Sequence, residues 1–395
     1  MRGVAGPAAL IALGLSLAGC AVPPPGQPHA MTLEPVRVAS LPGFASDQLA
    51  RGFIAFQNSC SELLTLPADQ RLGGAGLAQS LGGTAGQWRS TCTAARAVSP
   101  TDEAAVRTFL ERNLVAYRVS ADTNATVQFS GYFEPVVAGS LHETAHFDIA
   151  LYGRPHDLVQ ADLGNFSPAL TGHLVAGRVR DGRLVPYFTR AEIAAGALQG
   201  RHLEVAWLAD PVDAFVLDIE GAGRIRLPDG DVVRVGYAGE NGQPYVPIGR
   251  ILTERDAIPK NAVTLSAIVA WLKAHPEQAQ AVMDENPSYV FLRILHGIPS
   301  DLGPPGALGV PLAPSRALAV DRNYIPLGAP VWIATTEPGS DKPLQRLMVA
   351  EDIGGSMATP LAADVFFGSG PAAGQAAGAM DQPGRAWLLL PRPPA

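Results

Sequence analysis

The feature that most constrains the fold is the sequence pattern after Val127, where short apolar runs alternate with Gly and Pro. Apolar runs bounded by turn-forming residues are typical of strands, and an Asp-Gly pair within one of them predicts a hairpin turn. The runs are VQFSGYFEPVV, HFDIALY, GRVRDGRLVPYF, LGVPLAP, RALAVD, APVWIAT, RLMVAED and RAWLLLP. DAFVLDIEGAGRIRLPDGDVVRVGYAG is predicted to add three strands, separated by Gly-Ala-Gly and Pro-Asp-Gly-Asp. The chain is therefore predicted to be mainly β, and its last runs have the pattern of a small closed barrel.

Three apolar periodicities predict accessory helices. The first helix begins after Ser46, with spacings of three and four between Leu49, Phe53, Phe56, Cys60 and Leu63. A second begins within residues 99–102, with Ser99 as its cap and Pro100 at its first position. A third covers residues 264–286 and is interrupted at Pro276.

The length and charge of the chain bound its class. The 395 residues leave room for one large or two ordinary domains, and a hydrophobic content of 47% is enough to fill a core. The formal net charge is -7, and no basic run stands out. Because nucleic-acid affinity depends on clustered Lys and Arg, no nucleic-acid partner is predicted.

The first twenty residues, MRGVAGPAALIALGLSLAGC, have the features of a lipoprotein signal. One Arg precedes an apolar run of secretory length, and the last four residues, Leu-Ala-Gly-Cys, resemble a bacterial lipobox. We expect residues 1–19 to be a signal peptide and Cys20 to be the lipidated first residue of the mature chain; a signal without lipidation is the alternative. Since Ala21 is not the Asp of an inner-membrane retention signal, we expect a lipid anchor in the outer membrane, facing the periplasm. The Pro-rich residues 20–44 are predicted to form an extended tether.

The cysteine count agrees with an oxidising compartment. Removing Cys20 from the three cysteines leaves Cys60 and Cys92, which we predict to form a disulfide. The bond would tie the first two predicted helices together. Two free, buried thiols are the alternative.

The pentapeptide HETAH at residues 142–146 matches the zinc-protease motif H-E-x-x-H. That motif needs a helix, on which the two histidines share one face. Here it leads into Phe147-Asp148-Ile149, an alternation of period two, so the histidines are predicted to lie on a strand or loop. A zinc metallopeptidase is therefore the weakest functional hypothesis, and no metal site is predicted.

Six stretches occur in an order that resembles one enzyme family. They are GYFEP (131–135), PYFTRAEI (186–193), RVGYAGENGQPYVPIGRIL (234–252), NPSYVF (286–291), GVPLAPSRALAVD (309–321) and RLMVAEDIGGSMATPLAADVFFGSG (346–370). Together they closely resemble the membrane-bound lytic murein transglycosylase A family. The resemblance implies a double-psi β-barrel interrupted by a second β-rich, barrel-like domain, with a saccharide groove between them. It implies a catalytic domain over residues 45–137 and 251–395 and an inserted domain over residues 138–250.

The resemblance also implies the catalytic residues. The family's single catalytic acid matches Asp364, and a second Asp before the Gly-Gly turn matches Asp352. Three departures concern subsite binding. Ala358 and Ala362 stand where basic residues are expected, and Glu220-Gly221-Ala222-Gly223 replaces the usual Gln-Gly-Ser-Gly.

The chemistry explains why one acid can be sufficient. Cleaving a glycosidic bond requires a neutral carboxyl that protonates the leaving group. A hydrolase also needs a second carboxylate, whereas a lytic transglycosylase uses the C6 hydroxyl of N-acetylmuramic acid to attack C1 and form a 1,6-anhydro ring. We expect apolar neighbours, and the charge of Asp352, to raise the pKa of Asp364. The functional hypothesis is a lytic murein transglycosylase that cleaves the MurNAc-GlcNAc β-1,4 bond; a catalytically impaired peptidoglycan-binding lipoprotein is the alternative.

Sugar recognition needs flat faces and hydrogen-bonding groups along a cleft. Candidate substrate-binding residues are Tyr132, Glu134, Tyr187, Tyr237, Asn241, Tyr245, Gly355 and Gly368. The glycines are expected where the backbone needs a positive φ or approaches the sugar closely. No cofactor is predicted. The expected partners are peptidoglycan glycan strands and the outer membrane, and the chain is expected to be a monomer.

Overall fold

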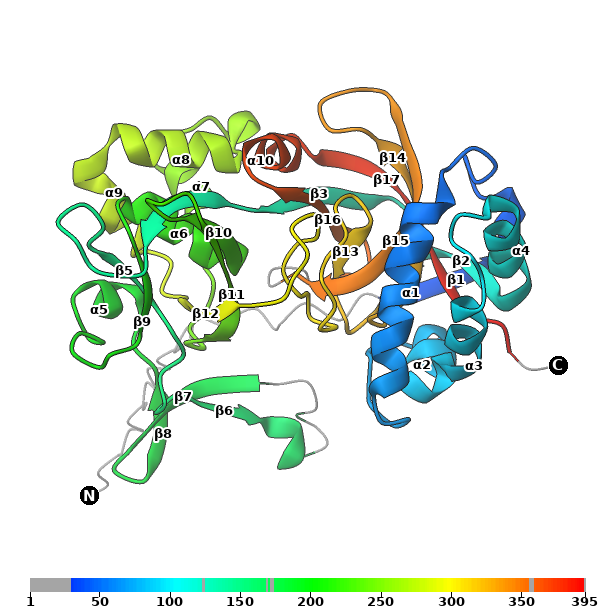
Figure 1. The fold of residues 1–395 in the computed structure, drawn as a ribbon, viewed down its shortest axis with the longest axis horizontal. Helices are drawn as coiled ribbons and strands as arrows, with labels where there is room; N and C mark the ends of the chain where they lie inside the picture. Colours follow the sequence, from blue (N-terminus) through cyan, green and yellow to red (C-terminus); the bar gives the residue numbers. More distant parts are fainter. Residues whose placement is uncertain (1–29, 123–124, 168–169, 171–173, 355–358, 394–395) are drawn as a thin grey trace, which may run out of the picture.

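The computed structural model describes residues 30–122, 125–167, 170, 174–354 and 359–393, which form two β-rich bodies joined by strand β3 (Figure 1). The first body is a sheet in the order β1-β2-β17-β14-β15-β13-β16-β3, with an additional β17–β3 pairing that closes six of its strands into a ring. The ring consists of β3 (Val127–Glu134), β13 (Ala317–Val320), β14 (Pro330–Thr336), β15 (Pro343–Ile353), β16 (Ala362–Ser369) and β17 (Asp381–Pro391). The predicted closed barrel is thereby confirmed.

The barrel core explains the apolar runs of the sequence. Trp332 on β14, Leu347 on β15 and Leu388 on β17 are fully buried. Strands buried on both faces show continuous apolar stretches rather than an alternation. LGVPLAP, which was predicted as a strand, is instead a loop before β13.

Four helices cover one side of the barrel: α1 (Leu49–Thr65), α2 (Leu77–Gly82), α3 (Ala85–Arg96) and α4 (Glu103–Asn113). The predicted apolar face of α1 is buried, which confirms this helix. The predicted disulfide between Cys60 and Cys92 is present. It joins α1 to α3 and not to α4 as expected, because Cys92 lies in a helix that the sequence reading did not identify. The cap of α4 is Asp102, whose carboxylate accepts a hydrogen bond from Ala105 N, and not Ser99.

The predicted tether is wrong for its last part. Residues Met31–Val36 form strand β1, which pairs antiparallel with β2 (Leu114–Ala121) at the edge of the barrel sheet. The burial of β1 alternates in part, and Val38 and Leu41, which follow it, are buried in the core. The chain is therefore folded from Met31 onward. The predicted signal peptide and Cys20 lie outside the described residues.

The second body contains two sheets. The larger has the order β12-β11-β10-β4-β9-β5. Its strands are β4 (Val136–Ser140), β5 (Ile149–Tyr152), β9 (Glu204–Leu208), β10 (Ala222–Arg226), β11 (Val232–Glu240) and β12 (Val290–Leu295). The smaller sheet, which projects from this body in Figure 1, contains β6 (Val159–Asp162), β7 (Leu174–Arg180) and β8 (Arg183–Pro186). The predicted Asp-Gly hairpin joins β7 to β8, with positive φ at Asp181 and Gly182.

Strand β12 changes the expected domain boundary. It pairs with β11 of the inserted sheet, although residues after 250 were assigned to the catalytic domain. Helices α7 (Ile248–Glu254), α8 (Leu265–Ala274) and α9 (Pro276–Met283) share a buried cluster with residues of α6 (Pro211–Glu220). The break at Pro276 is as predicted. We therefore place the end of the inserted body at Leu295.

Helix α6 also differs from the prediction, because its residues were expected to form a strand. The carboxylate of Asp210 accepts a hydrogen bond from Val212 N, and Pro211 takes the first helical position. Gly221 ends the helix with φ 68°. Start and stop signals were therefore present, but the run Phe215–Ile219 also reads as a strand. Two short helices complete the fold, α5 (Arg190–Ala194) and α10 (Pro371–Gly378). None of the helices described is long and apolar enough to cross a membrane.

Candidate active site

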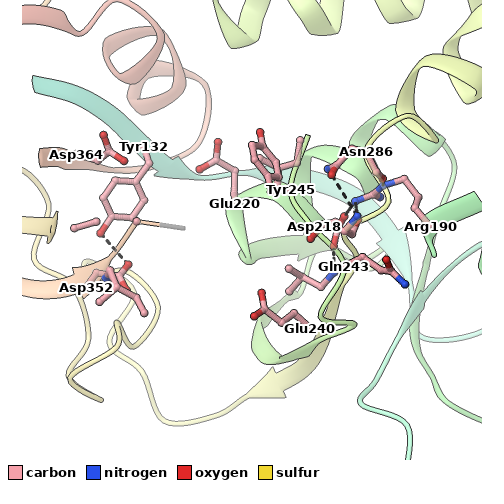
Figure 2. Close-up of a pocket in the computed structure, with 16 residues that line it drawn as sticks. Tyr132, Arg190, Asp218, Glu220, Glu240, Gln243, Tyr245, Asn286, Asp352 and Asp364 are labelled. Carbon is pink, nitrogen blue, oxygen red and sulfur yellow. Dashed lines mark hydrogen bonds and ion pairs between the residues drawn. The ribbon is translucent and has the colours of Figure 1, made fainter. Parts of the chain in front are cut away.

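A cavity of about 480 Å³ lies between the barrel and the inserted body, and carboxylates line it on both sides. Tyr132, Asp352 and Asp364 line the barrel wall (Figure 2). The facing wall carries the side chains of Arg190, Asp218, Glu220, Glu240, Gln243 and Tyr245. The cavity is therefore the groove that was expected between two β-rich bodies.

Strand register brings the two predicted catalytic aspartates to one face of the barrel. Ala319 on β13 lies opposite Asp352 on β15 and opposite Asp364 on β16. Directly opposed residues point to the same face of a sheet, and neighbouring strands are about 4.8 Å apart. The two aspartates are thus on the order of 10 Å apart at their Cα atoms, one on each side of a small alanine that also lines the cavity.

Asp364 on β16 is hydrogen-bonded to the neighbouring strand β3. It lies opposite Ser130 on β3, and the Ser130 hydroxyl donates a hydrogen bond to Asp364 Oδ1. Burial raises the pKa of Asp364, and the Ser130 hydrogen bond opposes that rise. Oδ2 accepts no hydrogen bond from the described residues, and Asp364 lines the cavity. A carboxyl with a raised pKa and one oxygen fixed in place can deliver a proton.

Asp352 lies in a different hydrogen-bonding environment. Its Oδ1 accepts from Ala307 N at 3.0 Å and from Ile353 N at 2.9 Å, and its Oδ2 accepts from Tyr132 Oη at 3.0 Å. Burial raises the pKa of Asp352, the charge of Asp364 adds to the rise, and the three hydrogen bonds oppose it. The expectation that Asp352 raises the pKa of Asp364 is not supported, because burial is what raises it at Asp364.

Glu220 is the carboxyl on the inserted wall that faces the barrel. Burial raises its pKa to about 8, with a further increase from the charge of Asp364. The sequence reading noted that a Glu replaces the family's usual Gln here but did not name it as a site residue. Arg190 and Asp218 were also missed. They form a buried ion pair at the far end of the cavity; Arg190 lies in the stretch PYFTRAEI but was not singled out there, and Asp218 lies in none of the six stretches.

Three predicted substrate-binding residues are used inside the inserted body or at its junction with the barrel. Glu134 is fully buried and pairs with Arg224 at 2.8 Å and Arg234 at 2.9 Å. The Tyr187 hydroxyl donates to Asp157 at 2.8 Å. Asn241 is fully buried and donates to the carbonyls of residues 188 and 287. None of the three lines the cavity as the described residues define it, so their polar groups stabilise the fold.

The remaining predicted residues divide between the cavity and elsewhere. Tyr132 and Tyr245 line it, and Tyr245 is 45% exposed. Tyr237 is 49% exposed on β11, and Gly368 has φ 108° at an irregular register between β16 and β3; neither is among the cavity-lining residues that the structure describes. Gly355 and Ala358 lie outside the described residues.

The HETAH segment is not helical. Residues 142–146 form bends between β4 and β5, as predicted. The backbone N–H of His142 donates to Ser140 Oγ, and that of His146 to Thr144 Oγ1. Within the described ranges, no three His, Cys, Asp or Glu residues are grouped so that they could hold a metal ion.

Comparison with known proteins gives matches in both bodies. Residues 128–293 match the family described as the MltA specific insert domain, and residues 316–390 match the 3D domain. The chain is 31% identical to membrane-bound lytic murein transglycosylase A of Vibrio cholerae over 276 residues, which are 68% of this chain and 66% of that protein. It is 31% identical to the Escherichia coli protein of the same name over 283 residues, 70% of this chain and 68% of that protein.

Solved structures match nearly the whole chain. A membrane-bound lytic murein transglycosylase from Agrobacterium tumefaciens has a TM-score of 0.80 and 31% identity, with coverage of 91% of this chain and 98% of that chain. MltA from Neisseria gonorrhoeae has a TM-score of 0.76 and 30% identity, with coverage of 92% and 94%. Escherichia coli MltA with bound chitohexaose has a TM-score of 0.63 and 26% identity, with coverage of 93% and 95%.

Proposed function

The chain belongs to the membrane-bound lytic murein transglycosylase A family, and from that membership we propose that it cleaves the β-1,4 bond between N-acetylmuramic acid and N-acetylglucosamine of peptidoglycan, leaving a 1,6-anhydro end. The observation that carries the proposal is Asp364, a cavity-lining carboxyl whose pKa is raised by burial and whose Oδ1 is held by the Ser130 hydroxyl. The chitohexaose bound to the Escherichia coli relative supports a β-1,4-linked amino-sugar strand as the ligand.

In the proposed reaction Asp364 acts first as an acid and then as a base. Its proton goes to the glycosidic oxygen, and the electron pair of the C1–O bond leaves with that oxygen. The C6 hydroxyl of the same N-acetylmuramic acid attacks C1, and its proton returns to the Asp364 carboxylate. Atoms and charge balance without water, and the acid is regenerated.

Asp352 supports the reaction from the other side of Ala319. Its hydrogen bond to Tyr132 Oη holds that ring in the cavity wall, where it can pack against a sugar face. Its carboxylate also contributes negative potential toward the oxocarbenium-like charge that develops at C1. We assign it a supporting function because its oxygens already accept three hydrogen bonds.

The cellular location of the protein is proposed from its first twenty residues. We propose that Cys20 carries a lipid anchor in the outer membrane, that the body faces the periplasm, and that a monomer without a cofactor acts on glycan strands. Strand β1 begins at Met31, so about ten residues lie between Cys20 and β1. A segment of ten residues spans at most about 35 Å when it is fully extended.

The Asp364→Asn variant tests the assignment of the acid. The amide is nearly the same size but cannot deliver a proton, so release of muropeptides from purified sacculi should fall at least roughly 100-fold. Sacculus binding should persist. Asp341→Asn, an exposed aspartate in the β14–β15 hairpin of the same body, is the matched control and should keep full activity. A wild-type protein that binds sacculi but releases nothing would favour the impaired wall-binding lipoprotein.

Chelation separates the zinc metallopeptidase hypothesis from the transglycosylase proposal. An enzyme that depends on Asp364 alone should keep its rate in excess EDTA, whereas a zinc peptidase would lose activity and regain it with zinc.

A further inference from the structure

Glu220 ends helix α6 with its side chain in the middle of the cleft. Figure 2 shows the carboxyl between Tyr132 and Asp364 on the barrel and Tyr245 on the inserted body. The helix stops there because Gly221 takes a left-handed conformation, which turns the chain into β10. The end of helix α6 therefore positions Glu220 between the two walls of the cavity, where a ligand would bind.

The carboxyl of Glu220 has little to bind within the protein. Of the described residues, only Phe133 on β3 bonds to it, through a backbone N–H at 3.5 Å, and that bond is long. Of the nearby carboxylates, Asp218 on α6 pairs with Arg190 and Glu134 on β3 pairs with two arginines, whereas Glu240 on β11 also lines the cavity. A half-buried carboxyl that lines a cavity without a strong protein partner is suited to a ligand.

We propose that Glu220 is a substrate-positioning residue, a neutral carboxyl that donates a hydrogen bond to the acetamido carbonyl oxygen of the amino sugar bound beside Asp364. This inference rests on the proposed function, because it requires a glycan in the cleft. Every sugar of a peptidoglycan strand or of a chitin oligosaccharide carries such a carbonyl, so the contact is available wherever the strand lies. Its function is to fix the sugar relative to Asp364, and it takes no part in proton transfer to the glycosidic oxygen.

The charges around Glu220 favour the neutral form that a donor needs. Asp364 faces it from β16, Tyr132 from β3, and Tyr245 from the segment before α7. On α6 itself, Asp218 is compensated by Arg190 from α5. Burial raises the pKa of Glu220 to about 8, and the charge of Asp364 acts in the same direction. The donor is thus present below about pH 8 and is lost as the pH rises above it.

The consequence is a pH-dependent affinity. An ionised Glu220 cannot donate and would oppose a carbonyl oxygen with its own negative charge. Sugar binding should therefore weaken by roughly tenfold between pH 6.5 and pH 9.5, the value of one hydrogen bond. Because the bond is made in the ground state as well as in the transition state, its loss should raise KM and leave kcat nearly unchanged.

The test measures affinity for N-acetylglucosamine hexasaccharide by calorimetry at both pH values. The Asp364→Asn protein is the parent, since it should not turn the sugar over and keeps burial, the largest cause of the raised Glu220 pKa. Glu220→Gln, Glu220→Ala and Glu254→Gln are added to it. The amide of Glu220→Gln still donates but does not titrate, so its affinity should be independent of pH. Glu220→Ala should bind roughly tenfold more weakly already at pH 6.5. Glu254→Gln, an exposed glutamate on α7, should follow the parent.

Three results would overturn the inference: a pH dependence that persists in Glu220→Gln, an unchanged affinity in Glu220→Ala, or no hexasaccharide binding by the parent. With Asp364 intact, Glu220→Gln should keep kcat within about threefold of wild type; a loss as large as that of Asp364→Asn would make Glu220 a catalytic residue and contradict the proposal. Failure of the proposed function is a separate result. In that case the parent binds the hexasaccharide with the predicted pH dependence, but the wild-type protein releases no anhydro product from sacculi.

Discussion

Replacing Ser130 with alanine should shift the pH profile of the enzyme toward higher pH. Ser130 on β3 donates a hydrogen bond to Asp364 Oδ1, and that bond lowers the pKa of the carboxyl against the larger effect of burial. Removing the hydroxyl leaves burial unopposed, so the pKa of Asp364 should rise further. The acid is active when protonated, so the limb on which kcat falls with rising pH should move upward.

The size of the shift follows from the hydrogen bond. A hydrogen bond to a charged group contributes about 1.5–3 kcal/mol, and one pKa unit corresponds to about 1.4 kcal/mol. The carboxyl of Asp364 is half-buried and not fully enclosed, so solvent replaces part of the lost bond. We therefore expect a shift of about 1 pH unit, with a lower maximum rate because the carboxyl loses its fixed orientation.

The assay follows kcat on soluble, uncrosslinked glycan strands from pH 4 to pH 10. Using kcat reports the enzyme–substrate complex and separates Asp364 from the effect on binding that Glu220 is proposed to have. Ser130→Thr is the matched control, since it keeps a hydroxyl at the same position and should keep the wild-type profile. A falling limb that does not move in Ser130→Ala, or that moves to lower pH, would refute the assignment of Ser130 as the residue that tunes and orients Asp364.

Three further changes test other parts of the account. Tyr132→Phe removes the hydrogen bond to Asp352 but keeps the ring, and kcat/KM should fall roughly tenfold, whereas an unchanged value would mean that the contact is unused. Glu134→Gln should lower the free energy of unfolding by about 3 kcal/mol in urea denaturation, because two arginines lose their buried partner; a change below about 1 kcal/mol would contradict this. The double variant Cys60→Ala/Cys92→Ala should lose about 3–4 kcal/mol of stability, from a cross-link of sequence separation 32, and equal stability under oxidising conditions would count against it.

The barrel is predictable from sequence because its strands are buried and have few polar interruptions. Trp332 and Leu388 lie in runs that no surface element would contain, and the turns between these runs carry Gly and Pro. Their pairing order is not predictable in the same way. The closing contact between β17 and β3 joins residues that are about 250 positions apart, and no local pattern encodes it.

Two local predictions fail for physical reasons that particular residues illustrate. Residues 215–219 form a short, mainly apolar run that is compatible with a strand, yet the Asp210 cap, Pro211 and Gly221 select a helix. Residues Met31–Val36 follow a Pro-rich stretch and lack a strong alternation, so only their pairing with β2 makes them a strand. In the first case local start and stop signals outweigh the apolar pattern, and in the second a tertiary contact outweighs a weak local preference.

The candidate site is predicted in part. Asp364, Asp352, Tyr132 and Tyr245 all line the cavity, although register and chain crossing bring them together from distant strands and loops. Glu134, Tyr187 and Asn241 have the same chemical features, but buried arginines, an aspartate or backbone carbonyls take up their polar groups. Glu220 was noted as a departure from the family's usual Gln but not named as a site residue, because its position in the cleft depends on where the end of α6 meets β3.

The mass of the released product tests the central claim most directly. Muropeptides released from sacculi by the wild-type protein in ¹⁸O-labelled water should end in 1,6-anhydro-N-acetylmuramic acid, one water lighter than a reducing end and without label. Reducing ends that carry ¹⁸O would contradict the account. They would mean that water attacks C1 and that a two-carboxylate hydrolase is at work, with Asp364 and a second carboxyl as the pair.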